Sequence, residues 1–283
     1  MARGSPMVTV TALFWTKMAF AAAVLGVGLA GALLPWVLAA RVAGERLLAV
    51  GDTFAAGVLC GAGLIHLLSG GIAGFHATFP GLSYPLALLL AGAGFFLILL
   101  IEGVVVAERS PTVEVHAGHD PGGARHEVGR ENAGAVRYAV ILLIVLSVHS
   151  VILGLALGAQ RSLAGALIVF LAIVAHKSMA GFALGVGYYR EGFTRAAALP
   201  RVAFFAAMTP LGILVGAGAG LALATFGSRL FEAVFDSLGA GTFLYIATLD
   251  ILKTEFDSPG YRWQKWLAAL SGFAIMALLA IWI

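Results

Sequence analysis

Charged residues are scarce in this chain, and their scarcity excludes an ordinary soluble domain. Only 11% of the 283 residues are Asp, Glu, Lys or Arg, whereas 61% are hydrophobic. The mean hydropathy is +1.00. Soluble domains usually carry about 25% charged residues, so this composition indicates a polytopic helical membrane protein.

Cysteine is also nearly absent, since Cys60 is the only one. A single thiol excludes an internal disulfide, and Cys60 lies in an apolar run, where a packed thiol is commoner than a metal ligand. No nucleophile with a base and an orienting group is visible, and no three-ligand centre that could activate water. We therefore expect a protein that is not an enzyme.

The net charge of +3 is small, and the basic residues lie between apolar segments. Basic residues in such positions report membrane topology. We therefore expect a lipid bilayer as partner and no nucleic acid.

Eight hydrophobic segments, separated by polar breaks, account for most of the chain. Each is long enough to cross ~30 Å of hydrocarbon as an α-helix. We predict an all-α polytopic membrane protein that forms one transmembrane domain over residues 1–283. The predicted spans cover residues 14–40, 50–72, 84–107, 137–159, 163–189, 200–226, 230–252 and 264–283.

The basic residues are unequally divided between the two sides of these spans. An even number of spans puts both termini on one side, together with only Arg3, Lys17, Arg161 and Arg229. Because cytoplasmic loops carry the excess of Lys and Arg, we expect both termini outside. The opposite side holds Arg41, Arg46, Arg109, Arg125, Arg130, Arg137, Arg190, Arg195, Arg201, Lys253, Arg262 and Lys265.

Two histidines lie in the middle of the fourth and fifth spans, which join at residues 160–162. His149 is twelve residues before Arg161, and His176 is fifteen residues after it. With ~1.5 Å of rise per residue, an antiparallel hairpin would place both imidazoles near the bilayer centre, at depths differing by only about 5 Å. Ser150 and Lys177 follow them directly. Ionisable groups at that depth mark a functional site.

Three further ionisable residues lie in or at the edge of predicted spans. His66, in the outer half of the second span, is compatible with a place on an external entrance or with a packed core position. Glu102 and Asp250 lie near the cytosolic ends of their spans, so we expect them to pair with Arg109 or Lys253 as interfacial anchors.

The longest polar segment, residues 108–132, is predicted to be a flexible cytosolic loop. It contains His116, His119 and His126 among carboxylates, with Pro and Gly residues that argue against fixed structure. Two interpretations remain open. The segment is either a solvated linker or a weak, mobile metal binder.

Five stretches of the chain, in order, resemble the ZIP (zinc- and iron-regulated transporter-like) family of metal-ion transporters. They are FAAGVLCGAGLIHLL, HSVILGLALG, HKSMAGFALG, TPLGILVG and GAGTFLYIATLDIL. The resemblance implies a 3+2+3 arrangement with inverted repeats and a homodimer, for which we expect the plasma membrane. It also implies that helices one, four, five and six move metal inward as an elevator.

The resemblance implies a metal site on the fourth and fifth spans, and here the chain departs from the family pattern. His149, Ser150 and His176 match it, and we add His66 as a residue on the metal's path. Leu153 stands where an acid is usual, Ala180 stands where a glutamate is usual, and Lys177 replaces a polar residue. Lys177 is either a built-in cation at a second metal position or a lysine deprotonated by burial.

Three functional hypotheses follow from these residues. The first is a low-affinity transporter that carries Zn²⁺, Fe²⁺ or another divalent cation as substrate, without a permanently bound cofactor. The second is a degenerate, non-transporting family member that acts as a membrane sensor or partner protein. The third is a carrier of something other than a bare divalent cation. The paired histidines favour transport, whereas the loss of both acids favours the second hypothesis.

Overall fold

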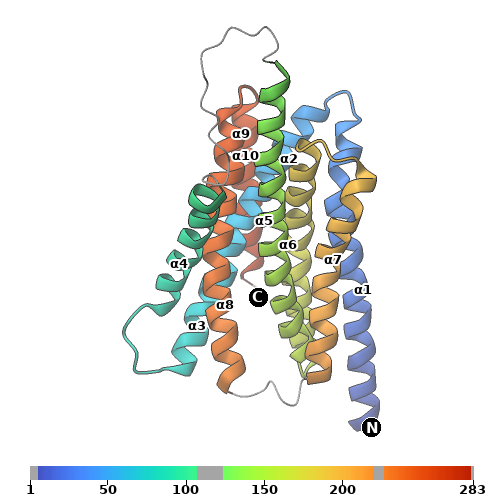
Figure 1. The fold of residues 1–283 in the computed structure, drawn as a ribbon. Helices are drawn as coiled ribbons and strands as arrows, with labels where there is room; N and C mark the ends of the chain where they lie inside the picture. The colour runs from blue at the N-terminus through green and yellow to red at the C-terminus, as the bar shows by residue number, and fades with distance from the viewer. Residues whose placement is uncertain (1–5, 107–123, 220–225, 282–283) are drawn as a thin grey trace.

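The structure is a computed structural model that describes residues 6–106, 124–219 and 226–281. Within these ranges every regular element is a helix, and the long helices run side by side (Figure 1). The predicted all-helical architecture is confirmed.

The helices form continuous rods, three of which contain a π-helical turn. These turns are η1 (Ala62–Leu67), η2 (Ile101–Val106) and η3 (Ile246–Leu252). Each carries an ionisable side chain, namely His66, Glu102 and Asp250 respectively, and π-turns are frequent at functional sites. The α-helices are α1 (Pro6–Ala39), α2 (Gly44–Gly61), α3 (Leu68–Thr78), α4 (Leu86–Leu100), α5 (Ala124–Ala159), α6 (Leu163–Arg190), α7 (Arg195–Ala219), α8 (Phe226–Tyr245), α9 (Lys253–Asp257) and α10 (Arg262–Leu279).

Seven of the eight predicted spans coincide with helical stretches that, in the described part of the chain, are long and apolar enough to cross a membrane. The eighth corresponds to α10. That helix has only 18 residues, and its first turn includes Arg262, Gln264 and Lys265. Its lower apolarity follows from this polar first turn.

The predicted loop over residues 108–132 needs a correction at its end. α5 begins at Ala124, so the last nine residues of this segment are helical and α5 extends beyond its predicted span. His116 and His119 lie outside the described residues, and His126 falls in the first turn of α5. Helical propensity in the stretch from Ala124 to Asn132 outweighs the turn signal of Gly122 and Gly123 just before it.

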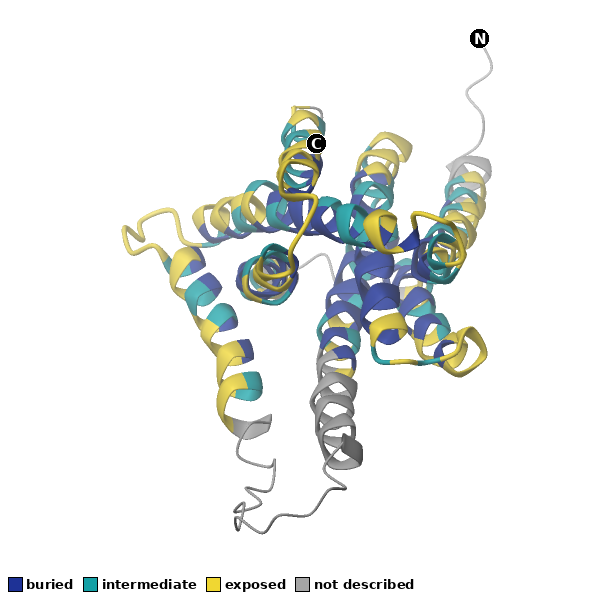
Figure 2. Cartoon of the chain, turned by 90° about the horizontal axis from the view of Figure 1, so that it is seen from above, coloured by how far each residue is buried: buried dark blue, intermediate teal, exposed yellow. Residues whose placement is uncertain are grey.

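The helices pack as two groups. The four-helix group consists of α1, α5, α6 and α7, and the frame group consists of α2, α3, α4, α8, α9 and α10. In Figure 1 the four-helix group occupies the centre and right, with α3, α4 and α8 to its left. Seen from above, buried residues gather where the helices meet, and exposed ones line the outer faces (Figure 2). α2 and α8 are the frame helices that reach α6 and α5.

Within each group the backbones approach closely through glycine. On α5 and α7 the approach is reciprocal: a Cβ at Gly154 would lie 2.3 Å from the Thr209 carbonyl oxygen, and one at Gly212 would lie 2.3 Å from that of Val151. Similar backbone approaches occur between α1 and α6, α2 and α10, and α4 and α8, at Gly185, Gly57 and Gly241. Small residues at such positions allow tight helix packing, so each group is held together by backbone contact.

This packing predicts a large cost for a side chain at Gly212. Gly212→Leu is expected to destabilise the protein by about 3 kcal/mol or more, because the added atoms would overlap the α5 backbone. Gly218→Leu is the matched control on the same helix, since nothing lies within 4 Å of a Cβ there. Thermal unfolding in detergent measures both. Equal melting temperatures for the two variants would contradict the close α5–α7 contact.

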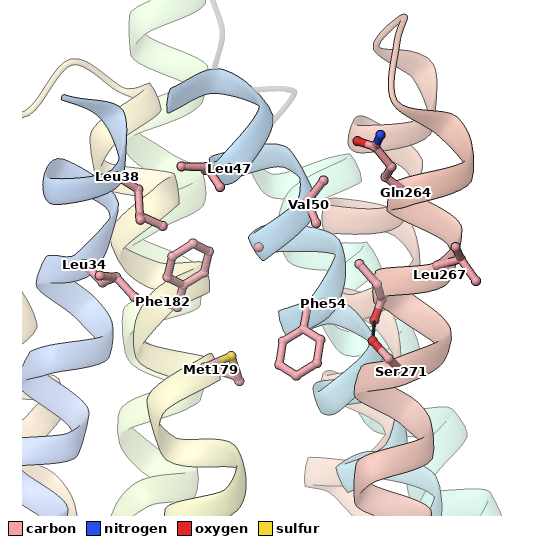
Figure 3. A pocket seen from close by; sticks show the side chains of 12 residues that line it. Leu34, Leu38, Leu47, Val50, Phe54, Met179, Phe182, Gln264, Leu267 and Ser271 are labelled. Atoms are coloured by element: carbon pink, nitrogen blue, oxygen red, sulfur yellow. Dashed lines mark hydrogen bonds between the residues drawn. The ribbon is translucent and has the colours of Figure 1, made fainter. Parts of the chain in front are cut away.

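Beyond the turn that joins α1 to α2, the glycines at the boundary between the two groups meet side chains instead. A Cβ at Gly51 of α2 would meet the ring of Phe182 on α6, and one at Gly239 of α8 would meet the His149 ring. An apolar groove of about 750 Å³ also separates the groups, with Phe182 and Met179 of α6 facing Phe54 of α2 (Figure 3). The helices therefore pack less tightly at the boundary between the groups than within either group.

Candidate metal site

The two mid-span histidines come together as their hairpin spacing predicts. His149 on α5 and His176 on α6 have ring centroids 5.9 Å apart. They keep only 7% and 2% of their surface exposed. Two imidazoles bound to one tetrahedral zinc would have centroids ~5 Å apart, so the observed separation is close to that of two rings that share an ion.

A third imidazole reaches the pair from the frame group. The ring centroid of His66, on η1, lies 6.2 Å from that of His176. Phe243 of α8 packs against His149 at 4.6 Å between centroids. The three histidines therefore meet at the boundary between the two helix groups.

One imidazole nitrogen in this cluster, the buried Nε2 of His149, has no hydrogen-bond partner within the described residues. A buried polar atom without a partner costs about 1–3 kcal/mol, so its retention points to a ligand. This nitrogen has a lone pair that a borderline metal ion can accept when the ring is neutral in the matching tautomer. The His176 ring has a hydrogen bond to the backbone of Ala172, one turn earlier on α6.

Ser150 and Lys177 form a separate polar contact. Lys177 Nζ donates hydrogen bonds to Ser150 Oγ at 2.7 Å and to the Phe205 carbonyl oxygen at 3.2 Å. The same ammonium lies 3.6 Å from the centroid of the Phe205 ring. Ser150 Oγ in turn donates to Leu146 O. Lys177 is therefore anchored on α7, inside the four-helix group, and the Ser150 hydroxyl is already engaged.

The two positions that lack the family's acids have different surroundings. Leu153 lies in an apolar cluster with Val24 of α1 and Ile213 of α7. Ala180 lies in the cluster that includes Phe243, the residue that packs on His149. Leu153 is therefore surrounded by apolar side chains of α1, α6 and α7.

Within the described residues, no three or more His, Cys, Asp or Glu side chains form a ready-made metal site. The arrangement therefore offers two or three imidazoles that must shift slightly to share an ion, with water completing the coordination. Neutral imidazoles bring no negative charge, so such a site binds a divalent cation more weakly than one with carboxylates.

Cavities lie on both sides of the histidines. The lower cavity, on the side of the membrane where α1 begins, has a volume of about 370 Å³ and is lined by His66, Ser69 and Asp236. The upper cavity, toward the other side, has about 290 Å³ and is lined by Asp52, Glu191 and Asp250 among others. Asp236 was not predicted from the sequence, although an acid six residues inside the seventh predicted span is a signal that could have identified it.

Glu102 and Asp250 were predicted to pair with Arg109 or Lys253. Arg109 lies outside the described residues, and the structure gives the two acids other contacts. The Tyr245 hydroxyl donates to Glu102 Oε2 at 3.1 Å. Asp250 lines the upper cavity. The π-turn η3 carries Asp250 into the bundle, so it does not act as an anchor at the interface.

Charged residues connect the two groups at the upper end of α6. Arg190 forms salt bridges with Asp52 of α2, at 3.2 Å, and with Glu255 of α9. Glu255 also pairs with Lys265 of α10, with 3.4 Å between Oε2 and Nζ. This network fixes the end of α6 against the frame group.

The carboxyl group of Glu191 lies just beyond α6, at the rim of the upper cavity. Burial raises its pKa to about 7, against the opposing effects of the Ala139 amide, which donates to Oε1 at 3.1 Å, and of the Arg201 guanidinium. The charge of this rim therefore changes near neutral pH.

Comparison with known proteins shows similarity over both helix groups. A family model described as "ZIP Zinc transporter" matches residues 106–280. The chain is 30% identical to zinc transporter ZIP2 of Homo sapiens, over 93% of this chain and 96% of the relative. It is 30% identical to ZIP2 of Mus musculus, over 91% and 94%. It is 31% identical to zinc transporter ZIP1 of Homo sapiens, over 82% and 78%.

Proposed function

Because the chain belongs to the ZIP family of zinc transporters, we propose that it moves zinc or a similar divalent cation toward the cytosol, with His149 and His176 as ligands. The observation that carries this proposal is the pair of buried imidazoles, of which His149 Nε2 lacks a hydrogen-bond partner within the described residues. A purely structural helix pair would not need them.

The proposed site has low affinity. Two neutral imidazoles and water replace the carboxylates that would neutralise a divalent cation as it loses water. When it is protonated, Lys177, which follows His176 directly in the chain, also raises the electrostatic cost of a second positive charge. A weak site suits transport, because the ion must also be released.

The proposed movement is an elevator-type shift of the four-helix group against the frame group. Backbone contacts at glycine support a rigid body on each side, whereas the boundary is formed by side chains and an apolar groove (Figure 3). His149 and His176 would move with the four-helix group, and His66 would stay with the frame. The Arg190 pairs with Asp52 and Glu255 would have to break or rearrange during the shift.

The direction of transport, the orientation and the assembly follow from the charge pattern and the family resemblance. The excess of basic residues supports a cytosolic location for the upper cavity and an external location for both termini. The family resemblance supports a homodimer, which we place in the plasma membrane.

Uptake into proteoliposomes tests the function. A Cys60→Ala, Arg161→Cys variant, labelled with an impermeant thiol reagent, reports which fraction of molecules exposes the predicted external face. We expect zinc to accumulate in proportion to that fraction. We also expect zinc to be preferred over Mg²⁺ and Ca²⁺, because imidazole favours borderline over hard cations.

A folded protein that gives no flux above empty vesicles, for any divalent cation tried, would overturn the transport proposal. It would favour the alternative, a non-transporting family member that acts as a sensor or partner protein.

A further inference from the structure

The His149–His176 pair lacks the negative charge that a divalent cation needs when it loses water. Neither Leu153 nor Ala180 supplies it. The lower cavity does contain an acid, since Asp236 of α8 lines it together with His66 of η1. This carboxylate belongs to the frame group, on the opposite side of the boundary from the two mid-span histidines.

α8 presents Asp236 on the same face that meets His149. A Cβ at Gly239, three residues further on, would lie 3.5 Å from His149 Nδ1. Phe243, four residues beyond Gly239, packs on the same ring. Residues at such spacing share one helix face, so Asp236 lies one turn, ~4.5 Å, from the contact with His149, toward the start of α8.

The carboxylate is directed toward the chain segment that carries His66. A Cβ at Gly70 would lie 3.2 Å from Asp236 Oδ2, and Gly70 comes four residues after His66. Ser69 lines the same cavity. Its hydroxyl donates to the backbone carbonyls of Ile65 and His66, which leaves oxygen lone pairs as acceptors.

A carboxylate, an imidazole and a hydroxyl around a water-accessible cavity are ligands that suit a borderline divalent cation. The centroid of the His66 ring is also 6.2 Å from that of His176, so His66 lies next to both the lower cavity and the pair of mid-span histidines. We propose that Asp236 and His66 form a loading site for the divalent cation, which supplies negative charge from the frame group before the ion reaches His149 and His176.

The path of the ion beyond the lower cavity rests on the proposed function. The binding of the ion in that cavity does not. In this scheme the cation arrives partly hydrated at Asp236. It then exchanges this carboxylate for the imidazoles of the four-helix group, with His66 contacting it throughout. The Asp236 carboxylate, on the frame side of the boundary, thus compensates for the acids that are missing beside His149 and His176.

Asp236→Asn tests the charge with little change of shape, and Asp257→Asn is the matched control. Asp257 is exposed at the end of α9, away from the residues that line the lower cavity, and the control removes the same charge. Zinc-induced thermal stabilisation of the purified protein gives the binding constant, and uptake by proteoliposomes gives KM and kcat. We expect Asp236→Asn to weaken zinc binding and to raise KM at least about tenfold, with a smaller change in kcat. Asp257→Asn should change each less than twofold.

A positive test exchanges the ligand instead of removing it. Asp236→Cys in a Cys60→Ala background should shift preference from Zn²⁺ toward the softer Cd²⁺ by at least about tenfold, because a thiolate favours the softer ion. If this variant does not fold, the Asp236→Asn measurement alone decides the proposal.

The outcomes separate the two proposals. Wild-type zinc binding and KM in Asp236→Asn, with transport lost in His149→Ala, would overturn the loading site and leave the transport function standing. If the wild-type protein binds zinc but does not transport it, and Asp236→Asn abolishes this binding, the loading site is supported and the transport function is overturned.

Discussion

Alanine at position 149 or 176 is expected to lower zinc transport at low substrate concentration by about 100-fold or more. Each substitution removes one of two buried imidazoles whose rings lie 5.9 Å apart. The remaining ring and water would have to hold the ion alone. A 100-fold loss corresponds to ~2.7 kcal/mol of binding free energy, which is modest for a direct metal ligand.

The measurement is initial zinc uptake in proteoliposomes, together with zinc-induced thermal stabilisation of the same variants. The variants should fold, because each change opens only a small cavity. Their melting temperatures without metal should therefore lie close to that of the wild type, whereas the rise on adding zinc should be smaller, because only the site at Asp236 and His66 remains.

Two controls test whether the loss of uptake is specific to His149 and His176 or follows from the removal of any histidine. His76→Ala removes an exposed imidazole at the end of α3, outside the cluster. The triple change of His116, His119 and His126 to alanine removes the histidines of the segment 108–132. Both should retain more than half of the uptake. Wild-type uptake in both His149→Ala and His176→Ala would leave the histidine pair as a packing feature and would end its assignment as the transport site.

The hairpin geometry was predictable because it depends only on counting residues along two apolar spans. His149 and His176 lie at similar distances from the turn, and regular helices place them at similar depths. The helical spans follow equally from long apolar runs, which have no other stable form in a bilayer. These features are local, so they do not depend on which helices become neighbours.

The surroundings of each side chain were not predictable in this way. Leu153 shares a face of α5 with His149, but one turn further along it lies in an apolar cluster with residues of α1, α6 and α7, whereas His149 meets Phe243 of α8. Lys177 follows His176 directly, so it points to a different side and meets Phe205 of α7. Helical period gives the face of a residue, whereas the partner depends on how the helices cross.

Asp236 was missed for a related reason. In the sequence it is one acid near the beginning of a span, in a position where a charged side chain can reach water. Only the packing of α8 against η1 and α3 brings it into a cavity with His66. A site assembled from two helix groups leaves no compact motif in the sequence.

The second large effect is a gain, expected from a carboxylate at position 180. Ala180→Glu restores an acid one turn from His176, in the cluster that contains Phe243. We expect about a tenfold increase in zinc affinity from this change alone. We expect about a further tenfold increase when it is combined with Lys177→Gln. Each tenfold step corresponds to ~1.4 kcal/mol.

The double variant should gain more because Lys177 acts against the ion in two ways. Its positive charge repels the cation, and it lies three residues from position 180, within reach of the new carboxylate as an ion-pair partner. Glutamine at 177 keeps a donor for Ser150 Oγ and the Phe205 carbonyl oxygen while removing the charge. Calorimetric titration of purified variants with zinc measures both steps.

Two matched variants identify the cause of the gain. Ala180→Gln has nearly the size of Ala180→Glu without its charge, so it should show no gain and should share any cost of overpacking. Leu153→Glu places a carboxylate on α5 instead, in the apolar cluster with Val24 and Ile213, where it should lower stability without raising zinc affinity. A folded double variant at positions 177 and 180 that binds zinc no more tightly than the wild type would show that position 180 does not reach the ion. An equal gain from Leu153→Glu would show that the two helix faces have been assigned wrongly.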